Sequence, residues 1–451
     1  MSDRPAPPPS HARPGFLLAA PHSGSGKTLA TLALLRWLAR RGVEVAPAKA
    51  GPDYIDPAFH AAASGRSSVN LDPWAMRPAL LRRLAGSGDR PLVVEGMMGL
   101  FDGAADGTGS AADLAVLLGL PVVLVIDCAR QSHSVAALVR GFRDHRADVV
   151  LGGLILNRVG SARHEAMLRA ALEPLGLPVL VALPARADLA LPERHLGLVQ
   201  AGETEGLEAF LERAADGIGE GLDEALLMRL LAGPGRADAD LSGTQGTGSP
   251  AATPLTPLGQ RIAVARDVAF AFAYPHLLDG WQAAGAELSF FSPLADEGPA
   301  PDADAVFLPG GYPELHAGRL ADAAGFRAGV HAAAVRGARI YGECGGYMAL
   351  GETLEDADGK THAMLGLLPL ATSFRLRRRH LGYRRLSPLE ASPWAHPLTA
   401  HEFHYATVLR EGEADRLFAA RDALGADLGA MGLARGRVAG SFLHVVDRGA
   451  A

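Results

Sequence analysis

Short apolar runs alternate with longer amphipathic runs along the first half of the chain. Six apolar runs have the length and composition of buried strands, at residues 16–20, 43–48, 92–95, 122–127, 153–156 and 179–183. Helical patterns lie between and after them, from the run at 29–40 to a longer one at 203–231. Buried strands that alternate with helices predict a parallel sheet covered on both faces. Ligands of such sheets bind at the carboxyl ends of the strands.

A break in this pattern divides the chain. Residues 233–260 are rich in Gly, Ala, Ser, Thr and Pro, which is typical of a linker. A second α/β pattern begins at Arg261. We therefore expect one domain at residues 15–232, a linker at 233–260 and a second domain at 261–451. The proline-rich residues 1–14 are expected to be a disordered extension.

The composition narrows the class of protein. A length of 451 residues suits two or three domains, and 48% apolar residues suits a globular chain. A net charge of -6 is too small to indicate nucleic acid or an anionic membrane as a partner. No apolar run approaches the ~20 residues that span a bilayer. Two cysteines cannot build a disulfide framework, so we expect a cytoplasmic protein.

A phosphate-binding loop is expected at residues 20–28, between the first apolar run and the first helical run. Gly24 and Gly26 allow the backbone N–H groups to point at phosphate oxygens, and the helix N-terminus favours an anion. Lys27 can reach the terminal phosphates of ATP, and the Thr28 hydroxyl can ligate Mg²⁺. Pro21 stands where the usual pattern has glycine. The alternative is an ordinary Gly/Ser turn before a helix.

Polar residues end three other predicted strands. Lys49 would lie near Lys27 and could neutralise charge on a transferring phosphoryl group, although a surface lysine is an equal alternative. Glu95 and the nearby Asp102 could complete a Mg²⁺ site, or could be exposed loop acids. Asn157 could donate to and accept from the edge of adenine, or could form a turn.

A second kind of site is expected in the second half. Gly342, Cys344 and Gly346 have the spacing of a nucleophile elbow with cysteine in place of serine, between a strand and a helix. The flanking glycines relieve crowding around a strained nucleophile, and the helix N-terminus is expected to lower the pKa of the thiol. The alternative is a buried structural cysteine beside a tight turn.

A cysteine nucleophile needs a general base and donors for its oxyanion. His444 ends a predicted strand about 100 positions after Cys344, which is the right order for a Cys–His pair. The backbone N–H groups of Gly345 and of Gly311 could form the oxyanion hole. The segment His-Glu-Phe-His at 401–404 is one residue short of a helical zinc motif and reads as a strand, so we expect no metal there.

Long motifs in a fixed order make a family resemblance specific. They lie at residues 21–28, 51–57, 70–74, 95–103, 309–315, 342–350 and 440–444. Together they resemble the cobyrinic/hydrogenobyrinic acid a,c-diamide synthase family over nearly the whole chain after Pro14. The resemblance implies a dethiobiotin-synthetase-like P-loop domain followed by a class I (triad-type) glutamine amidotransferase domain. It also implies that ATP activates the a- and c-acetate carboxylates of a corrin as acyl phosphates, and that ammonia from glutamine displaces the phosphate.

The resemblance also assigns roles to residues. Cys344 and His444 would hydrolyse glutamine, while Lys27, Thr28, Glu95 and Asp102 would handle ATP and Mg²⁺. Asp53, Tyr54 and Ile55 would contact the corrin. Related glutaminases have a glutamate two positions after the histidine, where this chain has Val446 followed by Asp447. The third member of the triad therefore stays open.

Two alternative functions remain. One is a cobyric acid synthase, which amidates other corrin side chains. The other is a P-loop ATPase that binds a partner and carries an inactive glutaminase domain. The sequence does not decide whether the corrin holds cobalt, and a homodimer stays open as the oligomeric state.

Overall fold

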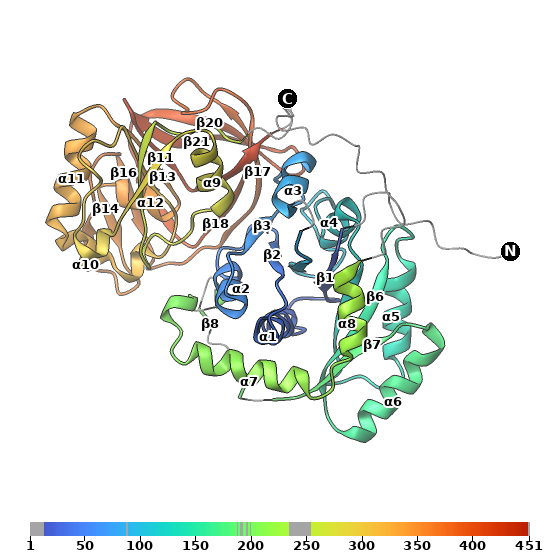
Figure 1. Ribbon diagram of the computed structural model, residues 1–451. Coiled ribbons are helices and arrows are strands. Elements are labelled where there is room, and N and C mark those ends of the chain that lie inside the picture. The colour runs from blue at the N-terminus through green and yellow to red at the C-terminus, as the bar shows by residue number, and fades with distance from the viewer. Residues whose placement is uncertain are drawn as a thin grey trace. The chain divides into compact units, whose positions relative to one another are not determined.

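The computed structural model describes residues 13–86, 89–186, 188–189, 193–194, 197–198, 200–233 and 254–449 (Figure 1). The extension expected at 1–14 and the linker expected at 233–260 lie largely outside the described residues. The chain forms two compact units, which meet in sequence near residue 251. Two short segments of the first half, Ala75–Arg77 and Ala104–Asp106, group with the second unit.

The first unit is built on a seven-stranded parallel sheet in the order β3-β2-β4-β1-β5-β6-β7. Its strands are β1 Gly15–Ala19, β2 Ala46–Ala50, β3 Val69–Leu71, β4 Leu92–Glu95, β5 Val122–Asp127, β6 Leu151–Val159 and β7 Val179–Pro184. A separate short hairpin pairs β8 Glu193–Arg194 with β9 Gly197–Leu198. Since β1 is the middle strand, the loop that connects it to the next helix lies at the carboxyl ends of the strands, near the centre of the sheet.

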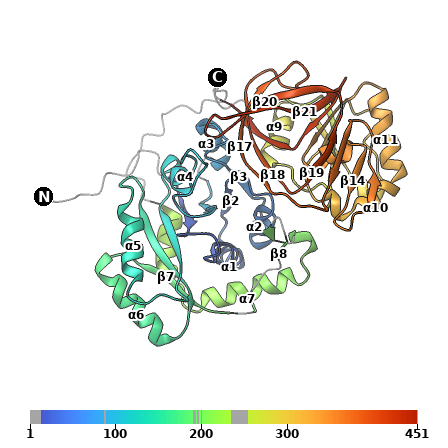
Figure 2. The ribbon, with the colours of Figure 1, turned by 180° about the vertical axis from the view of Figure 1, so that it is seen from behind.

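Helices cover both faces of this sheet, as is usual for a buried parallel sheet (Figures 1 and 2). Helix α1 packs against α2 and α7, and α5 packs against α6. The helices are α1 Lys27–Arg40, α2 Asp56–Ser64, α3 Pro78–Ala85, α4 Ala111–Leu118, α5 Val135–Asp144, α6 Ala162–Leu172, α7 Leu207–Gly219 and α8 Glu224–Ala232, with 3-10 turns η1 Glu173–Leu175 and η2 Ala201–Glu203.

The second unit contains a ten-stranded mixed sheet in the order β11-β10-β12-β13-β22-β21-β20-β17-β18-β23. These strands are β10 Arg261–Ala265, β11 Glu287–Phe291, β12 Ala305–Leu308, β13 Arg339–Glu343, β17 His380–Pro388, β18 Leu398–His404, β20 Asp415–Asp422, β21 Asp427–Arg435, β22 Val438–Ser441 and β23 Leu443–Arg448. A four-stranded sheet holds β15 Thr361–Ala363, β14 Thr353–Glu355, β16 Leu370–Ser373 and β19 Thr407–Glu411.

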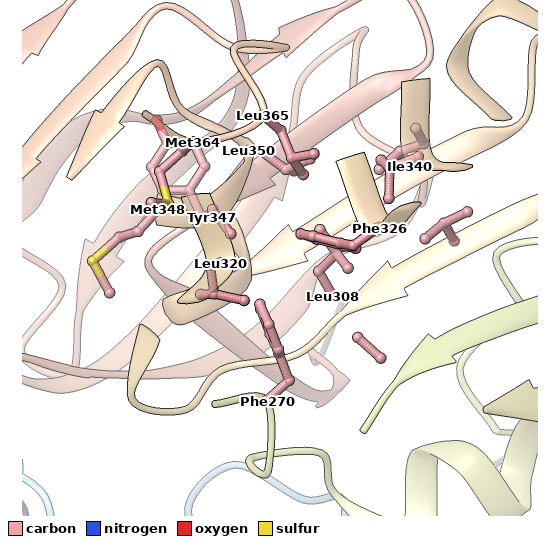
Figure 3. Close-up of a cluster of buried hydrophobic side chains, with 14 of the residues drawn as sticks. Phe270, Leu308, Leu320, Phe326, Ile340, Tyr347, Met348, Leu350, Met364 and Leu365 are labelled. Atoms are coloured by element: carbon pink, nitrogen blue, oxygen red, sulfur yellow. The ribbon is translucent and has the colours of Figure 1, made fainter. Parts of the chain in front are cut away.

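The helices of the second unit are short. They are α9 Pro275–Ala283, α10 Ala317–Asp322, α11 Ala324–Val335 and α12 Gly345–Leu350, with η4 Pro293–Ala295 and η5 Pro313–Leu315. Buried apolar side chains from β12, β13, α10, α11 and α12 pack into one core, which includes Leu308, Leu320, Phe326, Ile340 and Leu350 (Figure 3). This core supports the turn at Cys344. Among the described helices, none is long and apolar enough to cross a membrane.

The expected α/β class is confirmed, and most element bounds differ from the predicted ones by a few residues. Three larger differences have a local explanation. Strand β2 begins three residues later than predicted, since residues 43–45, which follow a turn at Gly42 with a φ of 70°, have no regular structure. Strand β3 was not predicted, since three residues with a central Asn70 carry no strand pattern. The long helix expected at 203–231 is two helices, because the chain breaks between Gly219 and Asp223, which caps α8 by accepting from Leu226 N at 2.8 Å.

Candidate active sites

The predicted phosphate-binding loop connects β1 to α1. Gly24 and Gly26 have φ values of 79° and 93°, a region that favours glycine. The Asn157 side chain at the end of β6 lies directly against Gly26, so a Cβ at Gly26 would collide with its amide nitrogen. That nitrogen donates to Ser25 O at 2.9 Å. Asn157 therefore holds the loop in shape, a contact that the sequence did not predict.

Lys27 lies at the start of α1 and is largely buried. Its Nζ donates to Met98 O at 2.5 Å, which ties the first loop to the loop after β4. Burial and the positive charge of Lys49 together lower the pKa of Lys27 to about 8, against the opposing charge of Glu95. Among the described residues, the hydrogen bond of this ammonium group is to a backbone carbonyl and not to a carboxylate.

Glu95 is the centre of a buried polar network at the end of β4. One oxygen, Oε1, accepts from Thr28 Oγ1 at 2.6 Å and from Lys49 Nζ at 2.8 Å. The other, Oε2, lies 2.7 Å from His60 Nε2. Lys49 also bonds Asp56 at the start of α2. A carboxylate that is deeply buried is thus matched by a cation and two further donors.

The charges within this network shift the pKa values of Glu95, Lys49 and Asp56 in different directions. Burial alone would raise the pKa of Glu95, but Lys49 and His60 outweigh it and hold this pKa below the usual range. Burial alone would lower the pKa of Lys49, but Asp56 and Glu95 raise it. For Asp56, burial and the charge of Asp53 raise the pKa. Glu95 is therefore ionised and Lys49 is protonated.

His60 was not predicted as part of this site. It lies four residues after Asp56 on α2, so the two side chains share one face of the helix. This spacing from Asp56 was the sequence feature that could have indicated His60 as a site residue. A single histidine in an alanine-rich helix gives no other indication of a role.

A cavity of about 480 Å³ opens between the loop and this network. Eight of the predicted residues line it: Gly24, Gly26, Lys27, Thr28, Lys49, Asp53, Ile55 and Glu95. Asp102 is exposed and accepts from Gly99 N at 2.8 Å, so it shapes its own loop. Asp53 accepts from the N–H groups of Ile55 and Asp56 and so shapes the turn into α2. The described residues lining the cavity do not include Asp102 or Tyr54.

A second cavity of about 570 Å³ adjoins the first and shares Gly26, Leu29, Arg158 and Leu189 with it. Its remaining lining is largely apolar and comes from β7 and α7, with Asn157 at the loop side. The two cavities together offer a polar region beside the glycine loop and an apolar region behind it.

The predicted nucleophile elbow joins β13 to α12. Cys344 has φ 47° and ψ -102°, a strained conformation for a residue with a side chain. A Cβ at Gly346 would collide with Leu308 O, and one at Gly342 would lie 2.7 Å from the Gly346 carbonyl carbon. Both glycines are therefore required by close backbone contacts. Cys344 is 4% exposed.

The expected lowering of the thiol pKa is wrong for this structure. Burial raises the pKa of Cys344 well above its usual range, and the nearby charge of Glu314 raises it further. The N–H of Gly345 acts in the opposite direction but is outweighed. The thiol is therefore neutral, and its nucleophilic form requires a base that removes the proton.

His444, at the start of β23, places its imidazole next to Cys344. A Cβ placed on Gly310 would lie 3.3 Å from both His444 Nε2 and Cys344 Cβ, so the two side chains meet at this glycine. Burial lowers the pKa of His444 to about 3, as do the neighbouring His401 and His404. The imidazole is thus neutral and can accept a proton. A Cβ on Gly345 would lie 2.9 Å from Gly311 N, so the two predicted oxyanion donors are neighbours.

The position after Val446 does not provide the third triad member. Asp447 is 1% exposed and is bound by the guanidinium of Arg77, through Nε at 2.9 Å and Nη2 at 2.8 Å. A different carboxylate, Glu343, has its Oε2 atom 3.7 Å from His444 Nδ1.

The segment 401–404 lies in strand β18, as predicted. Its Glu402 and His404 form a group with His380 in which potential ligand atoms lie within 4.8 Å of one another. Glu402 is already bound by Arg384, through Nε at 2.9 Å and Nη2 at 2.6 Å. In this structure the guanidinium of Arg384 therefore neutralises the charge of Glu402.

Comparison with known proteins matches a different family model to each half of the chain. Residues 16–199 match the family model of the CobQ/CobB/MinD/ParA nucleotide binding domain. Residues 261–450 match that of the CobB/CobQ-like glutamine amidotransferase domain. The chain is an enzyme of the class that joins a nucleotide-binding domain to a glutamine amidotransferase domain and forms C–N bonds with glutamine as the amido donor.

Its relatives define the class further. A protein of Brucella anthropi named hydrogenobyrinate a,c-diamide synthase is 64% identical over 437 residues, covering 96% of this chain and 98% of the relative. Proteins of the same name from a Sinorhizobium species and from Rhodobacter capsulatus are 62% and 53% identical, each over 96% of this chain and 98% of the relative. The chain belongs to the cobyrinic/hydrogenobyrinic acid a,c-diamide synthase family, and the predicted resemblance is confirmed.

Proposed function

We propose that the protein converts the a- and c-acetate carboxylates of hydrogenobyrinic acid into amides, using ATP and glutamine. The observation that carries this proposal is the identity of 53–64% with proteins named for that reaction, over nearly the full chain. The coexistence of a phosphate-binding cavity and a Cys–His pair supports it. We further propose residues 15–232 and 261–451 as the two functional domains, in a cytoplasmic protein.

In the first domain, the proposal assigns ATP to the two adjoining cavities. The phosphates would accept hydrogen bonds from the loop N–H groups, with Lys27 at the terminal phosphates and Lys49 close behind. The adenine would occupy the apolar cavity, with Asn157 able to reach one edge through its side-chain oxygen while its nitrogen holds Ser25.

A divalent cation fits the donors near the phosphates. Thr28 Oγ1 and Glu95 Oε1 lie 2.6 Å apart, and hydroxyl and carboxylate oxygens are the ligands that Mg²⁺ prefers. When bound, Mg²⁺ would neutralise phosphate charge. Thr28 and Glu95 would hold it, with Asp102 as a further carboxylate of the same loop region. Lys49 and His60 keep Glu95 ionised for this role.

The substrate carboxylate would attack the terminal phosphorus of ATP and form an acyl phosphate, with ADP leaving. An acyl phosphate is a good acyl donor but is easily hydrolysed, so the site must exclude water. We assign Asp53, Tyr54 and Ile55 to the corrin, with Ile55 and Asp53 at the cavity wall. Ammonia then attacks the acyl carbon, and inorganic phosphate leaves.

In the second domain, His444 Nε2 would take the proton of the Cys344 thiol as Sγ attacks the glutamine side-chain carbonyl. The carbonyl electron pair moves to oxygen, where the N–H groups of Gly345 and Gly311 stabilise it. Collapse of this intermediate breaks the C–N bond, and the proton on His444 leaves with ammonia. Water then attacks the thioester with His444 as base, which releases glutamate and restores the thiol.

A product assay tests the proposal. The purified protein would be incubated with glutamine, ATP and Mg²⁺, separately with hydrogenobyrinic acid and with its cobalt-containing counterpart, and amides would be counted by mass spectrometry. Two amides on the a and c side chains of the metal-free ring are expected. Two amides only on the cobalt form would move the substrate to cobyrinic acid. Amides at other side chains would favour a cobyric acid synthase, and ATP hydrolysis without any amide would favour a P-loop partner-binding ATPase.

A further inference from the structure

We propose that Glu343, the residue immediately before the nucleophile, positions His444 and completes the triad in place of a carboxylate after the histidine. This inference rests on the proposed glutamine hydrolysis. Its physical basis is the position of the buried Glu343 carboxylate, which contacts both the imidazole of His444 and the backbone N–H of Val445.

Glu343 ends strand β13 and is 2% exposed. Its Oε1 accepts from Val445 N at 3.1 Å, which fixes the carboxylate against β23 directly beside His444. The other oxygen, Oε2, then faces His444 Nδ1 at 3.7 Å. This separation is longer than a hydrogen bond, and catalytic contacts of this kind commonly tighten in the reacting complex.

The two ends of the His444 ring have different neighbours. Nε2 lies at Gly310 beside Cys344, and Nδ1 faces Glu343. A carboxylate on the Nδ1 side selects the tautomer that carries its proton on Nδ1, so that the lone pair of Nε2 can accept the thiol proton. It also stabilises the imidazolium that forms when that proton arrives.

Two other buried carboxylates of this unit, Asp447 and Glu402, are bound by other side chains. Asp447 is bound by Arg77, and Glu402 is bound by Arg384 and His404. Glu314, on η5, acts on the thiol and raises the pKa of Cys344. Glu343, in contrast, has its Oε2 atom 3.7 Å from Nδ1 of the catalytic histidine.

The protonation of Glu343 gives a distinct signature. Burial raises the pKa of Glu343 to about 8. Groups facing this pair are His401, Glu402 and His404 from β18, Cys344 and Tyr341 from β13 and its turn, and Glu314 from η5. Because the ionised carboxylate is the form that stabilises the imidazolium, glutamine-dependent turnover is expected to rise with pH up to about 8.

The experiment compares E343Q, E343D and the wild type in the full-length enzyme. E343Q keeps the size of the side chain and the acceptor for Val445 N but loses the charge. We expect its glutamine-dependent kcat to fall at least about 100-fold, with the KM for glutamine changed less than about threefold and the rise with pH removed. E343D should recover part of the activity together with that pH dependence.

Three controls make the result decisive. Amidation driven by added ammonium chloride should be unchanged in E343Q, which shows that the chain is folded and the synthetase site works. The matched variant D447N tests the rival carboxylate. The role of Glu343 would be overturned if E343Q kept the kcat and pH profile of the wild type. It would also be overturned if D447N lost the rise of turnover with pH while E343Q kept it. A wild type that does not hydrolyse glutamine would instead overturn the proposed function.

Discussion

Two buried glutamates at strand ends show how neighbours decide the charge of the same side chain. Glu95 ends β4 and is held below its usual pKa by Lys49 and His60, which outweigh its burial. Glu343 ends β13, and burial raises its pKa to about 8, with the N–H of Val445 acting in the opposite direction. The first is ionised and suited to a cation, whereas the second changes charge near neutral pH.

The substitution K49M is expected to remove the only ammonium that bonds both Glu95 and Asp56 in the described structure. Uncompensated buried charge typically costs about 3–5 kcal/mol, so the free energy of unfolding should fall by that order and ATP-dependent amidation should be lost. Denaturant unfolding of the purified variant measures this.

Lys360 provides the matched control, because its side chain is exposed. K360M should change the free energy of unfolding by less than about 0.5 kcal/mol. Equal effects of the two substitutions would contradict the assigned network.

Glu343 also predicts a dependence of stability on pH. Its carboxyl is expected to titrate near its ordinary pKa of 4.5 when unfolded and at about 8 when folded. The folded state thus holds the proton over this interval, and the stability it contributes is fully present below pH 4.5 and is lost as pH rises to about 8. E343Q should remove this loss, at about 1.4 kcal/mol per pH unit at most. Unfolding of both proteins across this pH range would reveal the difference, and identical slopes would contradict it.

At the scale of elements, sequence pattern succeeded where a local rule determines the structure. The strand at Val122–Asp127 was predicted with its observed bounds, because an unbroken apolar run between polar ends has few alternatives. The loop before Lys27 and the turn at Cys344 were predicted because glycines at fixed spacing meet a strand and a helix. The contacts of Asn157, His60 and Glu343 were not, since each depends on which distant strand or helix lies beside it.

The turn between β13 and α12 predicts a sharp difference between two glycines. At Gly346 any Cβ would collide with Leu308 O of the adjacent strand, and this atom cannot move freely. G346A should therefore destabilise the second unit by more than about 3 kcal/mol and abolish glutaminase activity. Thermal unfolding and a glutamate-release assay measure the two effects.

Gly337 is a suitable comparison, since it has a φ of 80° but open space around its Cα. G337A should cost only about 1 kcal/mol, the usual backbone strain, and should leave turnover unchanged. A mild G346A variant would show that the turn can relax around an added methyl group.

At the scale of the whole molecule, each unit has its own core and its own predicted half-reaction. The chemistry links them, because ammonia at neutral pH is mostly ammonium and does not attack an acyl phosphate. Ammonia made at Cys344 is therefore expected to reach the second reaction without equilibrating with the medium.

The variant C344A tests this division of labour. It should lose glutamine-dependent amidation by at least about 1,000-fold, while amidation with added ammonium chloride persists and increases with pH. In the wild type, an enzyme that consumes free ammonia in the medium should leave glutamine-dependent product formation unchanged. Loss of product under that condition would show that ammonia is released.

The hydrogen bond from Asn157 to Ser25 has a thermodynamic consequence for the first step. The phosphate-binding loop is held by a side chain of strand β6, so the protein's own hydrogen bond contributes to its shape. A loop that is already ordered loses little conformational entropy when ATP arrives. Calorimetric binding of nucleotide should then show a heat that reflects new phosphate contacts and only a small entropic penalty.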